Sequence, residues 1–243
     1  MRADYPTPQQ TDGLRALWKE AFSDTDAFLD RFFETGFAYD RCRCICKDGK
    51  VAAALYWFDC RCDGAPMAYI YAVATAKAFR GMGLCKALME DTHSHLKNLG
   101  YAATILVPGE KGLFAMYEKM GYQCFGGMDT ITCQAGEKVE LRKTSPEEYA
   151  ALRRQYMPAC GVEQEGMAVL ATYATLYAGN DFVLAATEEI GLELLVNTAT
   201  APGILAALGK KSGRFRLPGS NPFAMWHPLT NTPTPSNFGI AFD

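Results

Sequence analysis

The sequence of 243 residues predicts an α/β fold built on a mixed β-sheet, followed by a second, smaller α/β domain. Three observations carry this prediction. An Asp-Gly pair near residue 48 joins two strand-like runs, which is typical of an antiparallel hairpin. A glycine-rich turn at residues 80–85 stands between a strand and a helix, which predicts a parallel crossover. A short segment near residue 7 recurs near residue 145, which predicts a second copy of one fold.

Two amphipathic helices are expected at the start of the chain. Apolar residues recur at helical spacing over residues 14–22 and again over residues 28–33. Either Asp24 or Thr25 is placed to cap the second helix, because their side-chain oxygens accept hydrogen bonds from free N–H groups. Gly36 is placed to end it.

Three strands are expected next, joined by tight turns and therefore antiparallel. They cover residues 41–47, 50–59 and 68–75. In a two-residue hairpin at Asp48-Gly49, Cys46 would face Val51, and the pairs Cys44–Ala53 and Cys42–Leu55 would follow.

After the third strand the pattern becomes a crossover. A helix runs from the glycine-rich turn to about Leu99 and stops at Gly100. The buried-type strand over residues 101–107 is then expected to be parallel to its predecessor. A short helix over 113–120 and a strand starting at Tyr122 complete the first half.

The second half is expected to form its own domain. The segment Thr7-Pro8-Gln9-Gln10, followed by Leu-Arg, has a counterpart in Ser145-Pro146-Glu147-Glu148, which is also followed by Leu-Arg. We therefore expect one domain at residues 1–135 and a second at residues 136–243. Helices are predicted over 164–177 and 202–208, and strands over 182–186, 222–226 and 238–242. The glycine-rich turn has no counterpart in this half.

Composition excludes several classes of protein. The net charge of −3 provides no basic excess for nucleic acid, so no nucleic-acid partner is expected. The sequence has no run of about 18 apolar residues, so no membrane span is expected, and no secretory signal is expected from its first residues. Nine cysteines, an odd number, are expected to be reduced thiols. These features predict a cytoplasmic protein without a membrane partner.

The glycine-rich turn is the motif that points to chemistry. Glycines at the N-terminus of a helix let an anion approach free backbone N–H groups. A Walker loop is excluded because Leu84 and Cys85 follow Gly83 instead of Lys and Ser or Thr. A dinucleotide fingerprint is excluded because its third glycine position holds Lys86 and the next strand offers no acid.

The segment from Tyr71 to Cys85 instead resembles motif A of the GNAT acetyltransferase superfamily. Arg80, Gly81 and Gly83 match its Arg-Gly-x-Gly form, and residues 116–122 (Met-Tyr-Glu-Lys-Met-Gly-Tyr) are similar to a second family segment. The resemblance covers roughly residues 1–135 and departs at Cys85, where the family has Gly or Ala, and at Lys77, where proline is frequent. Together with the segment that recurs near residue 145, it suggests that the second domain derives from a degenerate GNAT repeat without a pyrophosphate loop.

The resemblance implies an N-acetyltransferase that uses acetyl-coenzyme A as its acyl donor and needs no metal. Backbone groups of Val73 and Thr75 would pair with the pantetheine arm. The amides of the loop would hold the pyrophosphate, with Lys86 adding charge; this set is Arg80, Gly81, Met82, Gly83, Leu84, Cys85 and Lys86. Tyr117 would protonate the leaving thiolate, and the Val73 amide would stabilise the oxyanion.

The acceptor is expected to carry a primary amine, and its identity stays open among small amines, aminoglycoside-like compounds, amino acids and protein amines. A base must take the amine proton. The candidates are Asp59, Glu110, Glu34 and the terminal carboxylate at Asp243. Glu110 departs from the asparagine that many relatives have in this region.

Alternatives to this interpretation also follow from the sequence. The protein could bind an acyl-coenzyme A as a sensor or scaffold, transfer a longer acyl chain, or acylate a hydroxyl. The second domain could cover the acceptor site or form a homodimer. The cysteines at positions 42, 44, 46, 60 and 62 are interpreted as small apolar residues, because the hairpin register does not bring four thiolates together. The aromatic residues of the first two helices are interpreted as core.

Overall fold

The computed structural model describes residues 2–164, 167–195 and 200–241. The chain forms two compact units, each with its own helices and strands. Unit 1 comprises Met1–Gln123 and Met225–Pro233, and unit 2 comprises Cys124–Ala224 and Thr234–Asp243. The division differs from the predicted boundary at residue 135, because a segment from the far end of the sequence returns to unit 1. Long-range pairing causes this return, and no local signal in the sequence reveals it.

Unit 1 alternates helices and strands along the chain. Its elements are α1 (Thr11–Phe22), α2 (Asp26–Thr35), β1 (Cys42–Lys47), β2 (Lys50–Cys62), β3 (Ala65–Thr75), α3 (Leu84–Asn98), β4 (Ala103–Leu106) and α4 (Lys111–Glu118). The end of β11 (Ser212–Pro228) belongs to it as well. All the elements predicted for this region up to residue 120 are present, with their ends shifted by a few residues.

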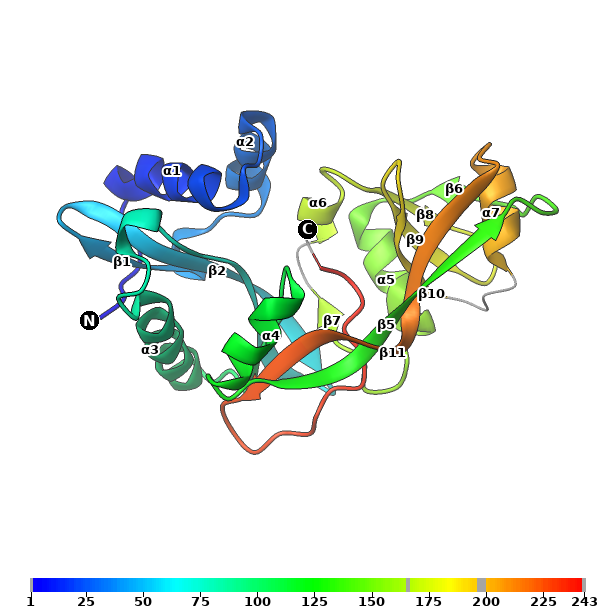
Figure 1. Cartoon of the computed structure of the whole chain (residues 1–243). Coiled ribbons are helices and arrows are strands. Elements are labelled where there is room, and N and C mark those ends of the chain that lie inside the picture. Colours follow the sequence, from blue (N-terminus) through cyan, green and yellow to red (C-terminus); the bar gives the residue numbers. More distant parts are fainter. Residues whose placement is uncertain (1, 165–166, 196–199, 242–243) are drawn as a thin grey trace. The chain divides into compact units, whose positions relative to one another are not determined.

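The sheet of unit 1 is mixed, as predicted. β1, β2 and β3 are antiparallel neighbours, and β4 lies parallel to β3. Met225 to Pro228 of β11 pair antiparallel with β4 on its other side. Helices α1 and α3 pack on opposite faces of β2 and β3 (Figure 1). Leu55, Trp57, Leu88 and Met225 belong to the buried core that these layers enclose.

The ends of the first helices follow the predicted signals. The Thr25 side chain accepts a hydrogen bond from the Phe28 N–H at 3.2 Å and so caps α2. The N–H of Gly36 bonds to the Phe32 carbonyl at 2.8 Å where the helix ends. Asp24 instead accepts a hydrogen bond from the Trp18 indole at 2.8 Å. Of the two cap candidates, Thr25 is therefore the one used.

The hairpin at Asp48-Gly49 is present, but its predicted register holds only next to the turn. Cys46 faces Val51 as predicted, whereas Ile45 faces Ala53 and Cys44 faces Ala54. A bulge with Ala52 as the extra residue causes the shift. The Ala52 carbonyl accepts a hydrogen bond from the Ala76 N–H at 2.9 Å, so the bulge ties the hairpin to the loop after β3.

Unit 2 contains a sheet whose strand order is β11-β10-β9-β8-β6, with β5 also pairing with β11. α5 and α7 pack on this sheet. Its elements are β5 (Gln123–Gln134), β6 (Arg142–Lys143), α5 (Pro146–Tyr156), β7 (Glu163–Gln164), α6 (Met167–Leu170), β8 (Thr175–Ala178), β9 (Val183–Ala186), β10 (Gly191–Leu195), α7 (Ala201–Ala207) and most of β11. Both copies of the recurring segment begin a helix, α1 and α5, while their common origin stays a prediction.

Predictions for unit 2 were less accurate than those for unit 1. The helix predicted over 164–177 is wrong: its described part contains the last residue of β7, the four-residue α6 and then β8. β10 and the first half of β11 were not predicted. Residues 238–241 form no strand, and residue 242 of that prediction lies outside the described residues. Short strands at the edge of a small sheet carry little periodicity, so local patterns alone misassign them.

A buried ion pair holds the centre of unit 2. The Arg153 guanidinium contacts both carboxylate oxygens of Glu193, at 2.7 and 2.8 Å, and the Tyr149 hydroxyl donates to the same carboxylate. Gln164 accepts from Arg153 and donates to the Ile240 carbonyl, which fixes the C-terminal segment within this unit. Because both charges are enclosed, removing either one would leave the other unpaired.

Candidate functional site

The glycine-rich turn lies between the end of β3 and the start of α3. A 3₁₀ turn over Lys77–Phe79 comes first, and Gly81 and Gly83 then both adopt φ of +76°. A Cβ atom on either glycine would meet no atom within 4 Å. The glycines are therefore required by the left-handed backbone and not by lack of space.

The turn exposes a run of unpartnered backbone N–H groups. In the part of the chain that the structure describes, no group accepts a hydrogen bond from the N–H groups of residues 81–86. Gly83 is the N-cap of α3 and offers no side chain, and no acidic residue lies in the first helical turn. The positive end of the helix dipole and these free donors together form an environment that suits a phosphate group.

Arg80 closes the turn. Its Nε donates to the Thr75 carbonyl at 3.2 Å, and its backbone N–H bonds to the Lys77 carbonyl at 3.3 Å. The side chain is exposed. Arg80 therefore helps to fix the conformation of the loop, and its exposed guanidinium lies next to the segment with the free N–H groups.

β3 has an unpaired edge next to this turn. β3 and β4 pair only where Met67–Tyr69 face Ala103–Ile105, so the last residues of β3 have no neighbour in β4. A bulge falls in the same stretch: Leu55 of β2 stands opposite two residues, Ala72 and Val73, and Ala72 has φ of +48°. Backbone groups at such a bulge leave the regular ladder and can bind another extended chain.

The two predicted pantetheine contacts differ in their surroundings. Val73 is half-buried inside the bulge and packs against the core cluster that contains Leu84. The Thr75 carbonyl already accepts from Arg80, while the Thr75 hydroxyl is enclosed and has no hydrogen-bond partner among the described residues. An enclosed hydroxyl without a partner fits a ligand that supplies amide groups, as pantetheine does.

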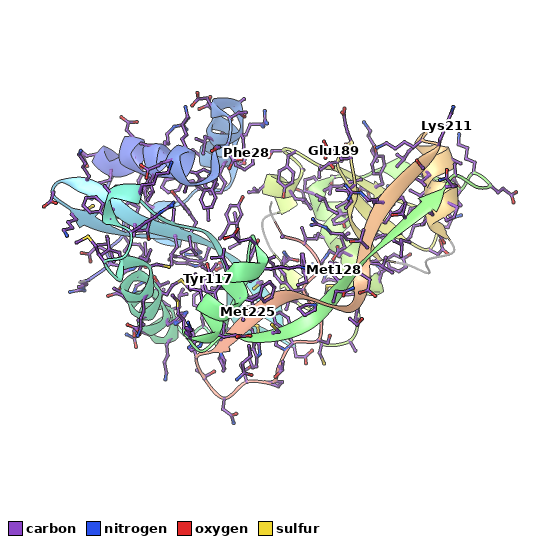
Figure 2. The ribbon with its side chains drawn as sticks, viewed as in Figure 1. Phe28, Tyr117, Met128, Glu189, Lys211 and Met225 are labelled. Carbon is purple, nitrogen blue, oxygen red and sulfur yellow. The ribbon has the colours of Figure 1, made fainter. Side chains whose placement is uncertain are left out.

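Tyr117 extends from α4 into the core of unit 1 (Figure 2). Its side chain is 6% exposed, and its ring contacts the Tyr122 ring edge-on at 5.7 Å between centroids. Burial, and to a smaller extent the nearby Cys85 thiol, raises the pKa of Tyr117 above its usual value. Within the described residues the hydroxyl has no hydrogen-bond partner. Tyr117 is therefore protonated at neutral pH and has a proton to donate.

Cys85 and Tyr117 are neighbours in this core. Burial raises the pKa of the Cys85 thiol, so the thiol stays protonated and is a poor nucleophile. The structure thus brings together Val73, Leu84, Cys85 and Tyr117 around one cluster, next to the free amides of the loop.

The predicted base candidates lie in different surroundings. Asp59 accepts from Arg41 Nη2 at 2.9 Å and from the Tyr101 hydroxyl, so its carboxylate is already paired. Glu34 is exposed on α2, and Glu110 is exposed at the N-cap of α4. Asp243 lies outside the described residues.

Besides Lys77 in the turn itself, two lysines lie near the loop, and only Lys86 was predicted to bind the ligand. Lys86 points along α3, where its ammonium is 3.7 Å from the Glu90 carboxylate. Lys47, at the end of β1, places its ammonium 3.6 Å from the Met82 sulfur and 5.7 Å from the centre of the Phe79 ring. Lys47 was missed because the hairpin is far from the loop in sequence.

The aromatic residues of α1 and α2 form a cluster, as expected for core positions. The centroid of the Trp18 ring lies 4.5 Å from the ring centroid of Phe32, 5.0 Å from that of Tyr56 and 5.6 Å from that of Tyr71. Trp18, Phe32 and Tyr56 are buried, whereas Phe22 at the edge of the cluster is 42% exposed.

The cysteine and histidine side chains are not arranged as a metal site in the described part of the chain. Over residues 2–164, 167–195 and 200–241, no group of three or more His, Cys, Asp or Glu side chains is arranged to hold a metal ion. Cys46 is exposed and accepts from Gln10, while Cys42 and Cys44 are buried in the hairpin. Among the described helices, none is long and apolar enough to cross a membrane.

A free run of amides at a helix N-terminus, beside an unpaired and bulged strand edge, offers a site for a ligand that carries both a phosphate and a peptide-like arm. Comparison with known proteins shows the family: the one described as "Acetyltransferase (GNAT) domain" matches residues 2–125. The chain therefore belongs to the GNAT acetyltransferase family, whose members use acetyl-coenzyme A. None of the curated proteins compared with it has a matching sequence.

Solved structures show the same fold over both units. A GCN5-related N-acetyltransferase from Kribbella flavida aligns with a TM-score of 0.69 and 16% identity, over 94% of this chain and 72% of that one. A conserved protein of unknown function from Enterococcus faecalis, a probable N-acyltransferase, aligns with a TM-score of 0.70, 16% identity and the same coverage. Eis1 from Mycobacterium abscessus aligns with a TM-score of 0.68 and 10% identity, over 94% of this chain and 74% of that one. At these identities the likeness establishes the fold.

Proposed function

We propose that this protein is an acetyl-coenzyme A-dependent N-acetyltransferase that moves an acetyl group to a primary amine. The observation that carries the proposal is the run of unpartnered N–H groups at residues 81–86, at the positive end of α3 and beside the open edge of β3. A cytoplasmic location is part of the proposal and rests on the cysteine composition.

The loop and the strand edge bind the two parts of the donor. The amides of residues 81–86, shaped by Gly81 and Gly83, hold the pyrophosphate. The pantetheine arm, which has peptide-like amides, adds to the free edge of β3 at Val73 and Thr75. Arg80 keeps the loop in shape through its bond to the Thr75 carbonyl.

The chemistry is a direct transfer. The amine nitrogen attacks the thioester carbonyl and forms the C–N bond, the C–S bond breaks, and the amine proton leaves to a base or to water. The Val73 amide, displaced from the ladder by the bulge, stabilises the negative oxygen of the tetrahedral species. Tyr117 gives its proton to the departing thiolate, which its raised pKa allows because the phenol is protonated when the thiolate leaves.

The amine-bearing acceptor is proposed only as a class. A second candidate function, a sensor that binds acyl-coenzyme A without transfer, uses the same loop and needs no proton donor. Tyr117, buried among apolar residues with a hydroxyl that lacks a partner in the described chain, favours the enzyme. A hydroxyl that is not paired within the described chain is free to donate its proton to a ligand, as an acid for the leaving thiolate must.

Replacing Tyr117 with Phe tests the transfer. Thiol release from acetyl-coenzyme A is followed with lysine, spermidine, an aminoglycoside and a lysine-containing peptide as acceptors. We expect the Tyr117→Phe variant to lose about 10²-fold or more in kcat, because the leaving thiolate loses its acid, while the Kd for acetyl-coenzyme A is unchanged. The matched control is Tyr5→Phe, whose hydroxyl bonds to His95. Full turnover by Tyr117→Phe would contradict the catalytic assignment, and binding without turnover by the wild type would support the sensor.

A further inference from the structure

Lys47 is a half-buried cation beside the phosphate-binding loop. It ends β1, and its side chain lies over the Phe79 ring with the ammonium 3.6 Å from the Met82 sulfur. Phe79 and Met82 lie on either side of Arg80 and Gly81 in sequence, so the ammonium lies at the loop itself. Neither neighbour carries a negative charge.

Two other basic side chains of unit 1 near the loop are already engaged, while Lys77 is exposed at the start of the turn. Lys86 has Glu90 within 4 Å, and Arg80 donates to the Thr75 carbonyl. For Lys47, no carboxylate of a described residue lies within 4 Å of the ammonium. An ammonium without a counterion, beside a run of free backbone N–H groups, is placed to bind an anion.

The hairpin holds Lys47 at this place. Asp48 and Gly49 take left-handed φ values of +52° and +73°, as a tight two-residue turn requires. The Ala52 carbonyl in the hairpin bulge accepts from the Ala76 N–H at 2.9 Å. This backbone hydrogen bond ties β2, the partner strand of β1 in the hairpin that carries Lys47, to the segment that leads into the loop of free amides.

Coenzyme A carries one phosphate besides its pyrophosphate, on the 3′ carbon of the ribose. The adenosine is attached directly to the pyrophosphate, so a pyrophosphate bound at residues 81–86 brings the 3′-phosphate to the surroundings of the loop. We propose that Lys47 binds this 3′-phosphate and makes the protein select coenzyme A over its 3′-dephospho form. The inference rests on the proposed function, since it assigns a residue to the same donor.

Calorimetric titration with coenzyme A and with 3′-dephospho-coenzyme A tests this role. For the wild type we expect coenzyme A to bind about tenfold or more tightly, because a charge-assisted contact to a phosphate is lost in the dephospho ligand. In Lys47→Gln the two ligands should bind about equally, with the Kd for the dephospho form unchanged. Lys47→Arg should keep the preference.

Lys50→Gln is the matched control. Lys50 faces Lys47 across the hairpin and is exposed, so the same charge is removed from the same hairpin. This variant should keep the wild-type preference. A preference that persists in Lys47→Gln, or equal binding of both ligands by the wild type, would overturn the assignment of Lys47 while leaving the proposed function standing. Failure of the wild type to bind either ligand would overturn both.

Discussion

At the scale of single residues, a second core tyrosine, Tyr122, shows how buried polar groups of unit 1 are paired by hydrogen bonds. The Tyr122 hydroxyl lies 2.9 Å from His93 Nε2 and 2.7 Å from the Thr104 hydroxyl. His227 stacks on His93 with ring centres 4.3 Å apart, and its Nδ1 lies 3.0 Å from the Gly121 carbonyl oxygen. Every member of this cluster comes from unit 1, so the cluster joins α3, β4 and the returning segment of β11.

His93 makes the stability of unit 1 depend on pH. Burial, together with the neighbouring His227, lowers the pKa of His93 to about 3. In the unfolded chain the histidine has its ordinary pKa of about 6.5. Between about pH 3 and pH 6.5 the unfolded chain therefore binds a proton at this residue, whereas the folded protein does not. The free energy of unfolding should therefore fall as pH drops below about 6.5, by up to about 1.4 kcal/mol per pH unit from this group.

Urea unfolding at several pH values from 7 to 5 measures this slope. His93→Gln, which can still bond to the Tyr122 hydroxyl but does not titrate, should be less sensitive to pH than the wild type. An identical slope in the two proteins would show that His93 is not the group responsible.

At the scale of the elements, the agreement between sequence and structure depends on how local each signal is. Gly36 as helix end and the turn at Asp48-Gly49 are local and were predicted, and Thr25 was one of the two cap candidates. The Ala52 bulge was not, because it is set by packing and by the bond to the Ala76 N–H. The same holds for the site. The loop could be predicted because its signal lies within residues 80–86, whereas the position of Lys47 beside the loop depends on a hairpin that is distant in sequence.

Gly83 tests whether the backbone of the turn is the binding element. Gly83→Ala places a Cβ in open space but on a residue with φ of +76°, so it should destabilise the fold by about 1 kcal/mol. If the loop adjusts to relieve this strain, its amides move and acetyl-coenzyme A should bind several-fold more weakly. Calorimetry and chemical unfolding measure the two effects.

Gly109→Ala is the control for this variant. Gly109 also has open space around it but does not have a positive φ. Both its stability and its donor affinity should match the wild type. Wild-type affinity in Gly83→Ala would argue against a role for the left-handed turn in binding.

At the scale of the whole molecule, the two units are interleaved along the chain. Unit 1 needs Met225–Pro233, from which Met225 and Leu229 enter its buried core and Met225–Pro228 pair with β4. The predicted division at residue 135 omits this segment. A strand that arrives from the far end of the sequence cannot be predicted from the periodicity of either half.

A fragment of residues 1–135 should therefore fold poorly. Without the returning segment, β4 becomes an open edge and the core loses two apolar side chains, so lower stability and aggregation are expected. Circular dichroism and thermal unfolding of the fragment, compared with the complete chain, measure this. A fragment as stable as the complete chain would show that the returning segment contributes little to unit 1.

We infer that the loop at residues 80–86 binds acetyl-coenzyme A, and calorimetric titration measures this binding. The wild type should bind acetyl-coenzyme A with micromolar affinity. Arg80→Glu should lose this binding, because it removes the bond to the Thr75 carbonyl and adds a negative charge next to the amides. A folded wild-type protein that binds no acetyl-coenzyme A would contradict the claim, and the proposed transfer chemistry would fall with it.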